Sequence, residues 1–175
     1  MLIRLEEMTL PLLQEYYRGF QMDADVLMDM SRFREYRYDP EQVEAYYFRL
    51  KATQDRVDFL VMQGERPIGE VALKHIDRQA RSCELSIHLQ NDSVKNQGFG
   101  TQAEQLATEY AFDALEMDAV YANAVLKNTR SQHVLEKLGY EKTGEDETFA
   151  HYRMKSEFTG TKPCPPTSLP CSSGR

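Results

Sequence analysis

The sequence contains no apolar run that approaches the ~20 residues needed by a membrane-spanning helix. Its opening, Met-Leu-Ile-Arg-Leu-Glu-Glu, lacks a basic region followed by an apolar core, so we expect no secretory signal peptide. Cysteine is scarce as well, and three residues, an odd number, do not suit a disulfide framework. These absences together predict a cytoplasmic protein with no membrane partner.

Positive charge is also in short supply. The chain carries 21 lysines and arginines against 28 aspartates and glutamates, which gives a net charge of −7. Binding a nucleic acid requires a basic stripe that neutralises phosphates, and the sequence shows no such stripe. We therefore expect no nucleic acid among the partners, while the acidity slightly favours a cationic partner through electrostatic steering.

The length of 175 residues suits one domain with a core and is too short for two. The character of the chain changes in residues 158–175, which hold four of the seven prolines and almost no large apolar side chain. We interpret 1–157 as the folded domain and 158–175 as a disordered tail that is a candidate for a segment foreign to the natural domain. Cys164 and Cys171 in this tail have no histidine partners, so no metal site is predicted.

The most informative stretch runs from Cys83 to Ala114. Residues 83–89 alternate apolar and polar side chains, as a half-buried strand does, and an apolar stripe with helical spacing follows Gly98-Phe99-Gly100. A strand, a glycine turn and a helix in this order can hold a phosphate on the free N–H groups of the first helical turn. The alternative is a tight turn that simply requires glycine. A P-loop and a dinucleotide fingerprint are both excluded, because the Lys-Ser/Thr ending and the third glycine are missing.

The rest of the chain predicts an alternation of strands and helices. Asp39-Pro40 is typical of a helix start, and Gly139 is typical of a helix end. Residues 21–39 combine methionines and aromatic residues with aspartates, and are either a loop that fills gaps in the core or the wall of a substrate pocket. We expect further strands over 2–6, 57–62, 68–75, 119–125, 140–143 and 148–154. We expect one helix that begins after Thr9, two helices over 40–53 and 128–138, and one that follows the glycine turn and ends near Met117.

Two linked motifs point to a known family. The segment Asn128-Thr-Arg-Ser-Gln-His-Val-Leu-Glu-Lys-Leu-Gly-Tyr140, with Gln97-Gly-Phe-Gly-Thr101 upstream, resembles the GNAT superfamily of acyl-CoA-dependent N-acetyltransferases, in particular its RimJ/RimL-type branch. The likeness covers roughly residues 1–156. It implies an α/β (α+β) GNAT fold, with a mixed, mostly antiparallel six- to seven-stranded sheet that splays between strands 83–89 and 119–125 and is flanked by helices. The branch also implies a possible homodimer.

The resemblance further implies acetyl-CoA as cosubstrate and assigns its binding residues. The backbone of the strand end would bind the pantetheine arm, the glycine loop would bind the pyrophosphate, and an asparagine would contact the pantetheine. Lys95 stands where the family usually has Gln or Arg; it keeps a cation but not a bidentate fork, so weaker phosphate binding is expected. The implied residues are Ile87, His88, Leu89, Lys95, Asn96, Gln97, Gly98, Phe99, Gly100, Thr101, Asn128 and Ser131.

Acetylation of an amine needs a base, because an ammonium must lose a proton before it can attack a thioester. Glu84 is the first candidate, since a lone carboxylate on the polar face of the central strand has a raised pKa if the pocket is dry. The alternative for Glu84 is a solvated or ion-paired strand residue. His88 points the same way and has a suitable intrinsic pKa, while Glu147 and Tyr152 are reserves.

The departing thiolate needs a proton or a hydrogen bond, and many family members use a tyrosine for this task. The matching position here is Leu135, so that tyrosine is missing. Ser131 could serve the thiolate instead, or its hydroxyl could bond to the backbone of the first helical turn. The tetrahedral oxyanion could accept a hydrogen bond from a backbone N–H near Leu89.

These observations predict an N-acetyltransferase that moves an acetyl group directly from acetyl-CoA to a primary amine, either a small cationic amine or a protein N-terminus. Asp23, Asp25, Asp29 and Asp39 near the expected pocket favour a cationic amine. The missing tyrosine and the substituted loop position support an alternative, namely a non-catalytic acyl-CoA-binding or sensory module on the same fold.

Overall fold

Seven strands form one mixed sheet in the order β1-β2-β3-β4-β5-β7-β6. The computed structural model describes residues 2–24, 31 and 34–156. All neighbouring strands are antiparallel except β4 and β5, which run parallel. The predicted sheet is therefore confirmed. Its strands are β1 (Arg4–Glu7), β2 (Val57–Gln63), β3 (Arg66–Asp77), β4 (Ser82–Leu89), β5 (Ala119–Val125), β6 (Glu141–Glu145) and β7 (Phe149–Lys155).

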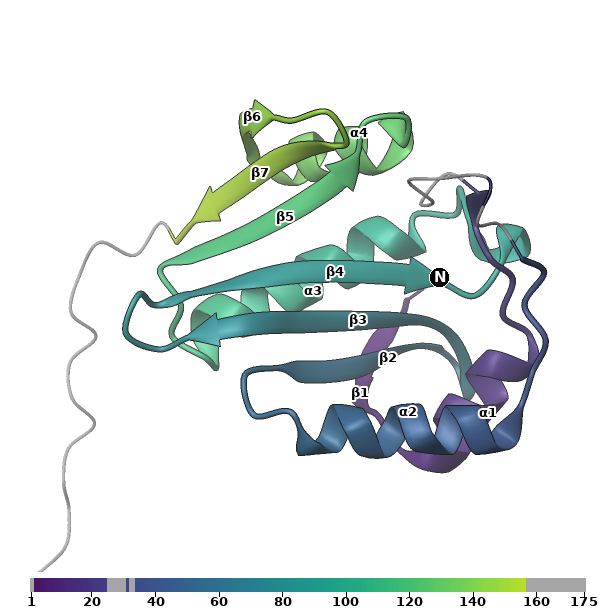
Figure 1. The fold of residues 1–175 in the computed structure, drawn as a ribbon. Helices are drawn as coiled ribbons and strands as arrows, with labels where there is room; N and C mark the ends of the chain where they lie inside the picture. Colours follow the sequence, from purple (N-terminus) through teal and green to yellow (C-terminus); the bar gives the residue numbers. More distant parts are fainter. Residues whose placement is uncertain (1, 25–30, 32–33, 157–175) are drawn as a thin grey trace, which may run out of the picture.

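Helices cover both faces of the sheet (Figure 1). They are α1 (Leu10–Arg18), α2 (Pro40–Ala52), α3 (Phe99–Asp113) and α4 (Thr129–Leu138). Alternation along β2 separates two cores, because Leu60 and Met62 pack against α1 and α2, whereas Val61 belongs to the core beneath α3 and α4. None of the helices in the described ranges is long and apolar enough to cross a membrane.

The parallel pair β4–β5 separates soon after it forms. Pairing joins Ser82–Leu85 to Ala119–Ala122 and then stops, and Figure 1 shows the two strands diverging beyond this point. On its other side β4 stays paired with β3 as far as Leu89. The edge of β4 beyond Leu85 that faces away from β3 therefore has no strand partner within the described sheet. This is the splay that the family resemblance implied.

Local signals account for most helix ends. The Asp39 side chain accepts hydrogen bonds from the backbone N–H groups of Glu41 and Gln42, as the predicted cap requires, and Gly139 ends α4 in the left-handed region at φ +94°. Thr9 precedes α1 as predicted but makes no side-chain cap hydrogen bond.

The α3 helix is shorter than predicted. It ends at Asp113 instead of near Met117, and Glu116 then adopts φ +57°, which turns the chain toward β5. The strands 66–77, 141–145 and 149–155 are displaced or extended by one or two residues from their expected bounds. The predicted tail, with Cys164 and Cys171, lies outside the described residues, as do Asp25 and Asp29.

One buried side chain fastens α1 to the end of β4. Gln90, which is 3% exposed, donates its Nε2 hydrogen bond to the Tyr16 carbonyl at 2.7 Å and accepts one from Arg66 Nη2 at 3.0 Å. Its backbone carbonyl accepts a hydrogen bond from the N–H of Gln21 at 2.8 Å. Gln90 therefore fixes the position of residues 16–21 relative to the open edge of β4.

We expect Gln90→Leu to lower the free energy of unfolding by about 1–3 kcal/mol, because it removes buried hydrogen bonds without removing much volume. Urea denaturation measures the change. Gln105→Leu, at an exposed position of α3, is the control and should stay within about 0.5 kcal/mol of the wild type. Equal stability of the two variants would show that Gln90 does not fasten this corner.

Candidate functional site

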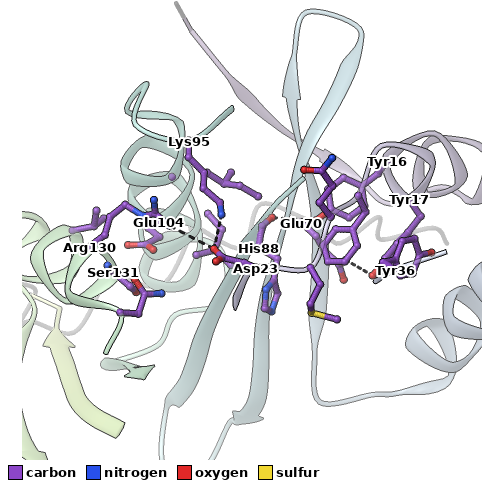
Figure 2. A pocket seen from close by; sticks show the side chains of 18 of the residues that line it. Tyr16, Tyr17, Asp23, Tyr36, Glu70, His88, Lys95, Glu104, Arg130 and Ser131 are labelled. Carbon is purple, nitrogen blue, oxygen red and sulfur yellow. Dashed lines mark hydrogen bonds and ion pairs between the residues drawn. The ribbon is translucent and has the colours of Figure 1, made fainter. Parts of the chain in front are cut away.

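The splay opens into a cavity of about 800 Å³, and side chains from α1, α2, β3, β4, α3 and α4 line it. Figure 2 shows two ends of different character. Lys95, Arg130 and Ser131 lie at one end, and Glu70 lies at the other end among tyrosine rings. His88 and Asp23 lie between them. A smaller cavity of about 430 Å³ continues between β4 and β5.

Most of the predicted acetyl-CoA residues come together in the larger cavity. They are Ile87, His88, Leu89, Lys95, Asn96, Gly98, Gly100, Thr101, Asn128 and Ser131. Two others do not line either cavity. Phe99 is 2% exposed in the core, and the side chain of Gln97 donates a hydrogen bond to the Ser93 carbonyl at 2.6 Å.

The glycine loop leads directly into α3. Gly98 lies in the left-handed region at φ +80°, which glycine adopts without strain, and no side chain caps the helix after it. The N–H groups of the first turn are therefore not engaged by a capping side chain and can accept an anion. At the start of α4 the Asn128 Oδ1 atom accepts a hydrogen bond from the backbone N–H of Ser131, with 3.1 Å between the oxygen and the nitrogen.

Lys95 is held by carboxylates. Its Nζ atom lies 2.6 Å from Asp23 Oδ2 and 2.5 Å from Asp92 Oδ1, and its side chain is only 9% exposed. Burial alone would lower the pKa of Lys95, but the hydrogen bonds and charges of the two aspartates outweigh it and raise the pKa. A second cation that the sequence analysis missed, Arg130, lies in the same cavity, 3.5 Å from Asp23. The loop cation is thus already paired, and Arg130 adds positive charge beside it.

The opposite end of the cavity is an aromatic box around a buried carboxyl group. Glu70 on β3, 6% exposed, accepts hydrogen bonds from the hydroxyls of Tyr17, at 3.1 Å, and Tyr46. Burial raises the pKa of Glu70, although both hydroxyls favour its carboxylate form. The rings of Tyr17 and Tyr36 lie 5.7 Å apart, centroid to centroid. Aromatic faces around a carboxylate are suited to a cation.

Glu84 and His88 occupy different places. Glu84 forms an ion pair with Lys74 at 3.0 Å across the β3–β4 pair, and it lines the smaller cavity but not the larger one. The His88 imidazole is exposed into both cavities. Desolvation by the surrounding protein lowers the pKa of His88, and the positive charge of Lys74 lowers this pKa further. His88 is therefore a neutral proton acceptor at pH 7 at the junction of the two ends.

Of the other residues discussed from the sequence, some line a cavity and some do not. Ser131 lines both cavities, and Leu135, at the position of the missing tyrosine, lines the smaller one. Glu147 is exposed in the β6–β7 turn, and the buried Tyr152 donates its hydroxyl to Glu136 at 3.1 Å. Neither of these two reserve residues lines the larger or the smaller cavity.

The sequence analysis missed two buried carboxyl groups, Glu70 and Glu104. Glu104 on α3 is 4% exposed and lines both cavities. Each is a charged residue within a strand or helix, a position that in a sequence alone is typical of an exposed face. A weak signal was available for Glu104, because it follows Ala103 inside the apolar stripe of the predicted helix.

Comparison with known proteins agrees with this geometry. The family description "Acetyltransferase (GNAT) domain" matches residues 3–141. A Bacillus subtilis (strain 168) protein described as probable N-acetyltransferase YjcK is 30% identical over 114 residues, which span 65% of this chain and 58% of the length of that relative.

Solved structures show the same fold at low sequence identity. A spermidine N-acetyltransferase from Vibrio cholerae, described as dodecameric, has a TM-score of 0.68 at 18% identity, covering 87% of this chain and 93% of that one. Mutant forms of the spermidine/spermine N-acetyltransferase SpeG from Vibrio cholerae give a TM-score of 0.67 at 17% identity, covering 88% and 95%.

We expect the pKa of the His88 imidazole to lie below its ordinary value, because desolvation by the surrounding protein and the charge of Lys74 outweigh the opposite effect of Asp23. Lys74→Gln should raise this pKa without restoring it fully, because burial is the larger cause. Histidine NMR titration measures both values. Lys142→Gln, on β6, is the control and should leave the titration unchanged. A His88 pKa above 6.5 would contradict this description of the site.

Proposed function

Because the chain belongs to the GNAT acetyltransferase superfamily, whose domain description matches residues 3–141, we propose that it transfers an acetyl group from acetyl-CoA directly to a primary amine. One observation carries the proposal. A single cavity joins the glycine loop and open strand edge, which suit acetyl-CoA, to an aromatic carboxylate box, which suits an ammonium, and His88 lies between the two.

The residues at the loop end fit acetyl-CoA. The unpaired edge of β4 from Ile87 to Leu89 can hydrogen-bond an extended amide-containing arm as an added strand would. The N–H groups after Gly98, together with Arg130, suit the phosphates. When bound, acetyl-CoA supplies the activated acyl group as a thioester.

His88 is the base that we propose for the amine. It is neutral at pH 7, it lies between the two ends of the cavity, and it can take the proton that the ammonium must lose. Glu84 remains a second candidate from the sequence, but its ion pair with Lys74 and its absence from the larger cavity make it the weaker one. We propose that the Ser131 hydroxyl serves the departing thiolate and that a backbone N–H near Leu89 serves the oxyanion.

The acceptor that fits best is a small cationic amine with an apolar portion. Glu70 provides the negative charge, and the surrounding rings provide apolar and cation–π contacts. Two of the aspartates expected here lie within the described residues and have other partners, since Asp23 is paired with Lys95 and Asp39 caps α2. The fold likeness to spermidine acetyltransferases supports the same class of amine. A protein N-terminus is the alternative acceptor.

Three finer assignments belong to this proposal. The Asn128–Tyr140 motif supports membership of the RimJ/RimL-type branch, and that branch in turn supports a homodimer. The sequence composition supports a cytoplasmic location.

A non-catalytic acyl-CoA-binding module is the second candidate. Two observations favour it, namely the apolar Leu135 at the tyrosine position and the capture of Lys95 by two aspartates. Such a module would bind acetyl-CoA without releasing CoA to any amine.

A thiol-release assay with acetyl-CoA and a panel of primary amines separates these candidates. We expect CoA release with at least one cationic amine, and a reduction of kcat by about 100-fold or more in His88→Gln, because general-base catalysis contributes about that much. Affinity for acetyl-CoA should change little. Saturable binding of acetyl-CoA with no release to any amine would favour the module.

Two matched substitutions complete this experiment. Glu84→Gln tests the other candidate base, and His133→Gln, exposed on α4, controls for the loss of a histidine. We expect His133→Gln to match the wild type and Glu84→Gln to lose much less activity than His88→Gln. The reverse order of the two base variants would return the role to Glu84.

Removal of the buried charge should affect the amine specifically. We expect Glu70→Gln to raise the KM for the amine by about 10–100-fold, since a charged hydrogen bond contributes about 1.5–3 kcal/mol. Affinity for acetyl-CoA, measured by calorimetry, should be unchanged. Tyr17→Phe removes a hydroxyl but keeps the ring, and should have a smaller effect.

The direction in which the KM for the amine changes with pH follows from the pKa of Glu70. Burial raises the pKa of Glu70, so the KM for the amine should rise as the pH falls through that pKa and the negative charge is lost. An unchanged KM in Glu70→Gln would exclude the aromatic box as the amine site.

A further inference from the structure

Glu104 is a buried carboxyl group without a polar contact on one of its oxygens. Its Oε2 atom is inaccessible to solvent and has no hydrogen-bond partner, and the residue is 4% exposed. It lies in the first turns of α3, and Figure 2 shows it on the same side of the larger cavity as Arg130 and Ser131. Leaving such a group unpaired destabilises a folded protein, so the site is incomplete as it stands.

Burial favours the neutral form of the Glu104 carboxyl group, because it raises the pKa of this group to about 8. A neutral carboxyl group has one O–H donor and a carbonyl acceptor, the same pair of functions that an amide offers in reverse. Glu104 is therefore equipped to pair with a neutral amide, and poorly equipped to hold a cation.

The smaller cavity, which Glu104 also lines from α3, is apolar in part. Leu85, Ala122, Ala124 and Leu135 contribute to its wall, together with polar residues that include Asn128 and Ser131. Opposite it runs the edge of β4 at Ile87, which has no strand partner on this side. A chain that carries amides can hydrogen-bond to this edge as an added strand would.

We propose that Glu104 binds the pantetheine arm of acetyl-CoA, its O–H donating a hydrogen bond to the carbonyl of one of the two amides of that arm. The inference rests on the proposed function, since that function supplies the ligand. Of the two substrates, acetyl-CoA contains a long neutral segment with two amides, and the amine does not.

Two substitutions test this role. Glu104→Met keeps most of the side-chain volume and removes both polar functions, while Glu104→Gln keeps a donor and an acceptor but cannot ionise. By calorimetry, we expect Glu104→Met to weaken acetyl-CoA binding about tenfold, the size of one or two neutral hydrogen bonds. We expect Glu104→Gln to stay within about twofold of the wild type.

A ligand without the pantetheine arm provides the matched comparison. Adenosine 3′,5′-bisphosphate carries phosphates and adenosine only, so its affinity should be equal in the wild type and in Glu104→Met. Gln105→Met, exposed on the next residue of α3, should change neither affinity. Equal weakening of both ligands by Glu104→Met would indicate general damage to the site and overturn the proposal.

Thermal unfolding of the unliganded protein gives a readout that does not depend on the ligand. Because Glu104→Met removes an unpaired buried oxygen, we expect its Tm to rise by about 2–4 °C while its affinity falls. A purely structural residue would lose stability instead.

The outcomes separate the two proposals. Absence of acetyl-CoA binding by the wild type would overturn the proposed function itself. Binding by the wild type that Glu104→Met leaves unchanged would overturn the role of Glu104 alone. Loss of binding in Glu104→Gln as well as Glu104→Met would show that an ionised carboxylate is required, which also contradicts the amide pairing.

Discussion

The loss of pairing between β4 and β5 after Leu85 is the constraint on which the rest of the site depends. Backbone N–H and C=O groups in a protein interior must be hydrogen-bonded, so an open strand edge beside a cavity must face water or a ligand. The structure holds the edge open from both sides. Full pairing of β5 with β7 keeps β5 in place, and the contacts of Gln90 with Tyr16 and Arg66 keep the end of β4 against α1. A cavity in this position is therefore a consequence of topology.

The two ends of the cavity carry different groups. Lys95 and Arg130 lie at the loop end beside the carboxylates that they contact, while Glu70 lies at the other end among tyrosine rings. Burial acts in opposite ways on two of the groups that line the cavity, since it lowers the pKa of His88 and raises the pKa of Glu104. Each shift favours the uncharged form of its group. The carboxylate of Asp23, whose charge also acts on His88, is paired with Lys95.

Most of the fold could be predicted from the sequence, but only part of the site could. Alternation over 83–89, the Asp39-Pro40 helix start and Gly139 act through neighbouring residues, so local patterns indicated them. The partners of charged residues lie far away in the chain. Lys95 meets Asp23, 72 positions earlier, and Glu84 meets Lys74 because of the β3–β4 register. Burial of Glu70 and Glu104 depends on which helices cover the sheet, and a single sequence contains no direct record of that.

Two departures from the family pattern acquire a different meaning once the structure is considered. Taken alone, Lys95 in the loop and Leu135 on α4 suggest a weakened enzyme. In the structure, Arg130 lies beside Asp23 and brings a guanidinium to the loop end, where the aspartates engage Lys95. Leu135 shares its cavity with Ser131 and Glu104, which bring hydroxyl and carboxyl groups to the same space from α4 and α3. Arg130 thus adds a guanidinium to the loop end, and Ser131 and Glu104 add a hydroxyl and a carboxyl group to the cavity that the apolar Leu135 lines.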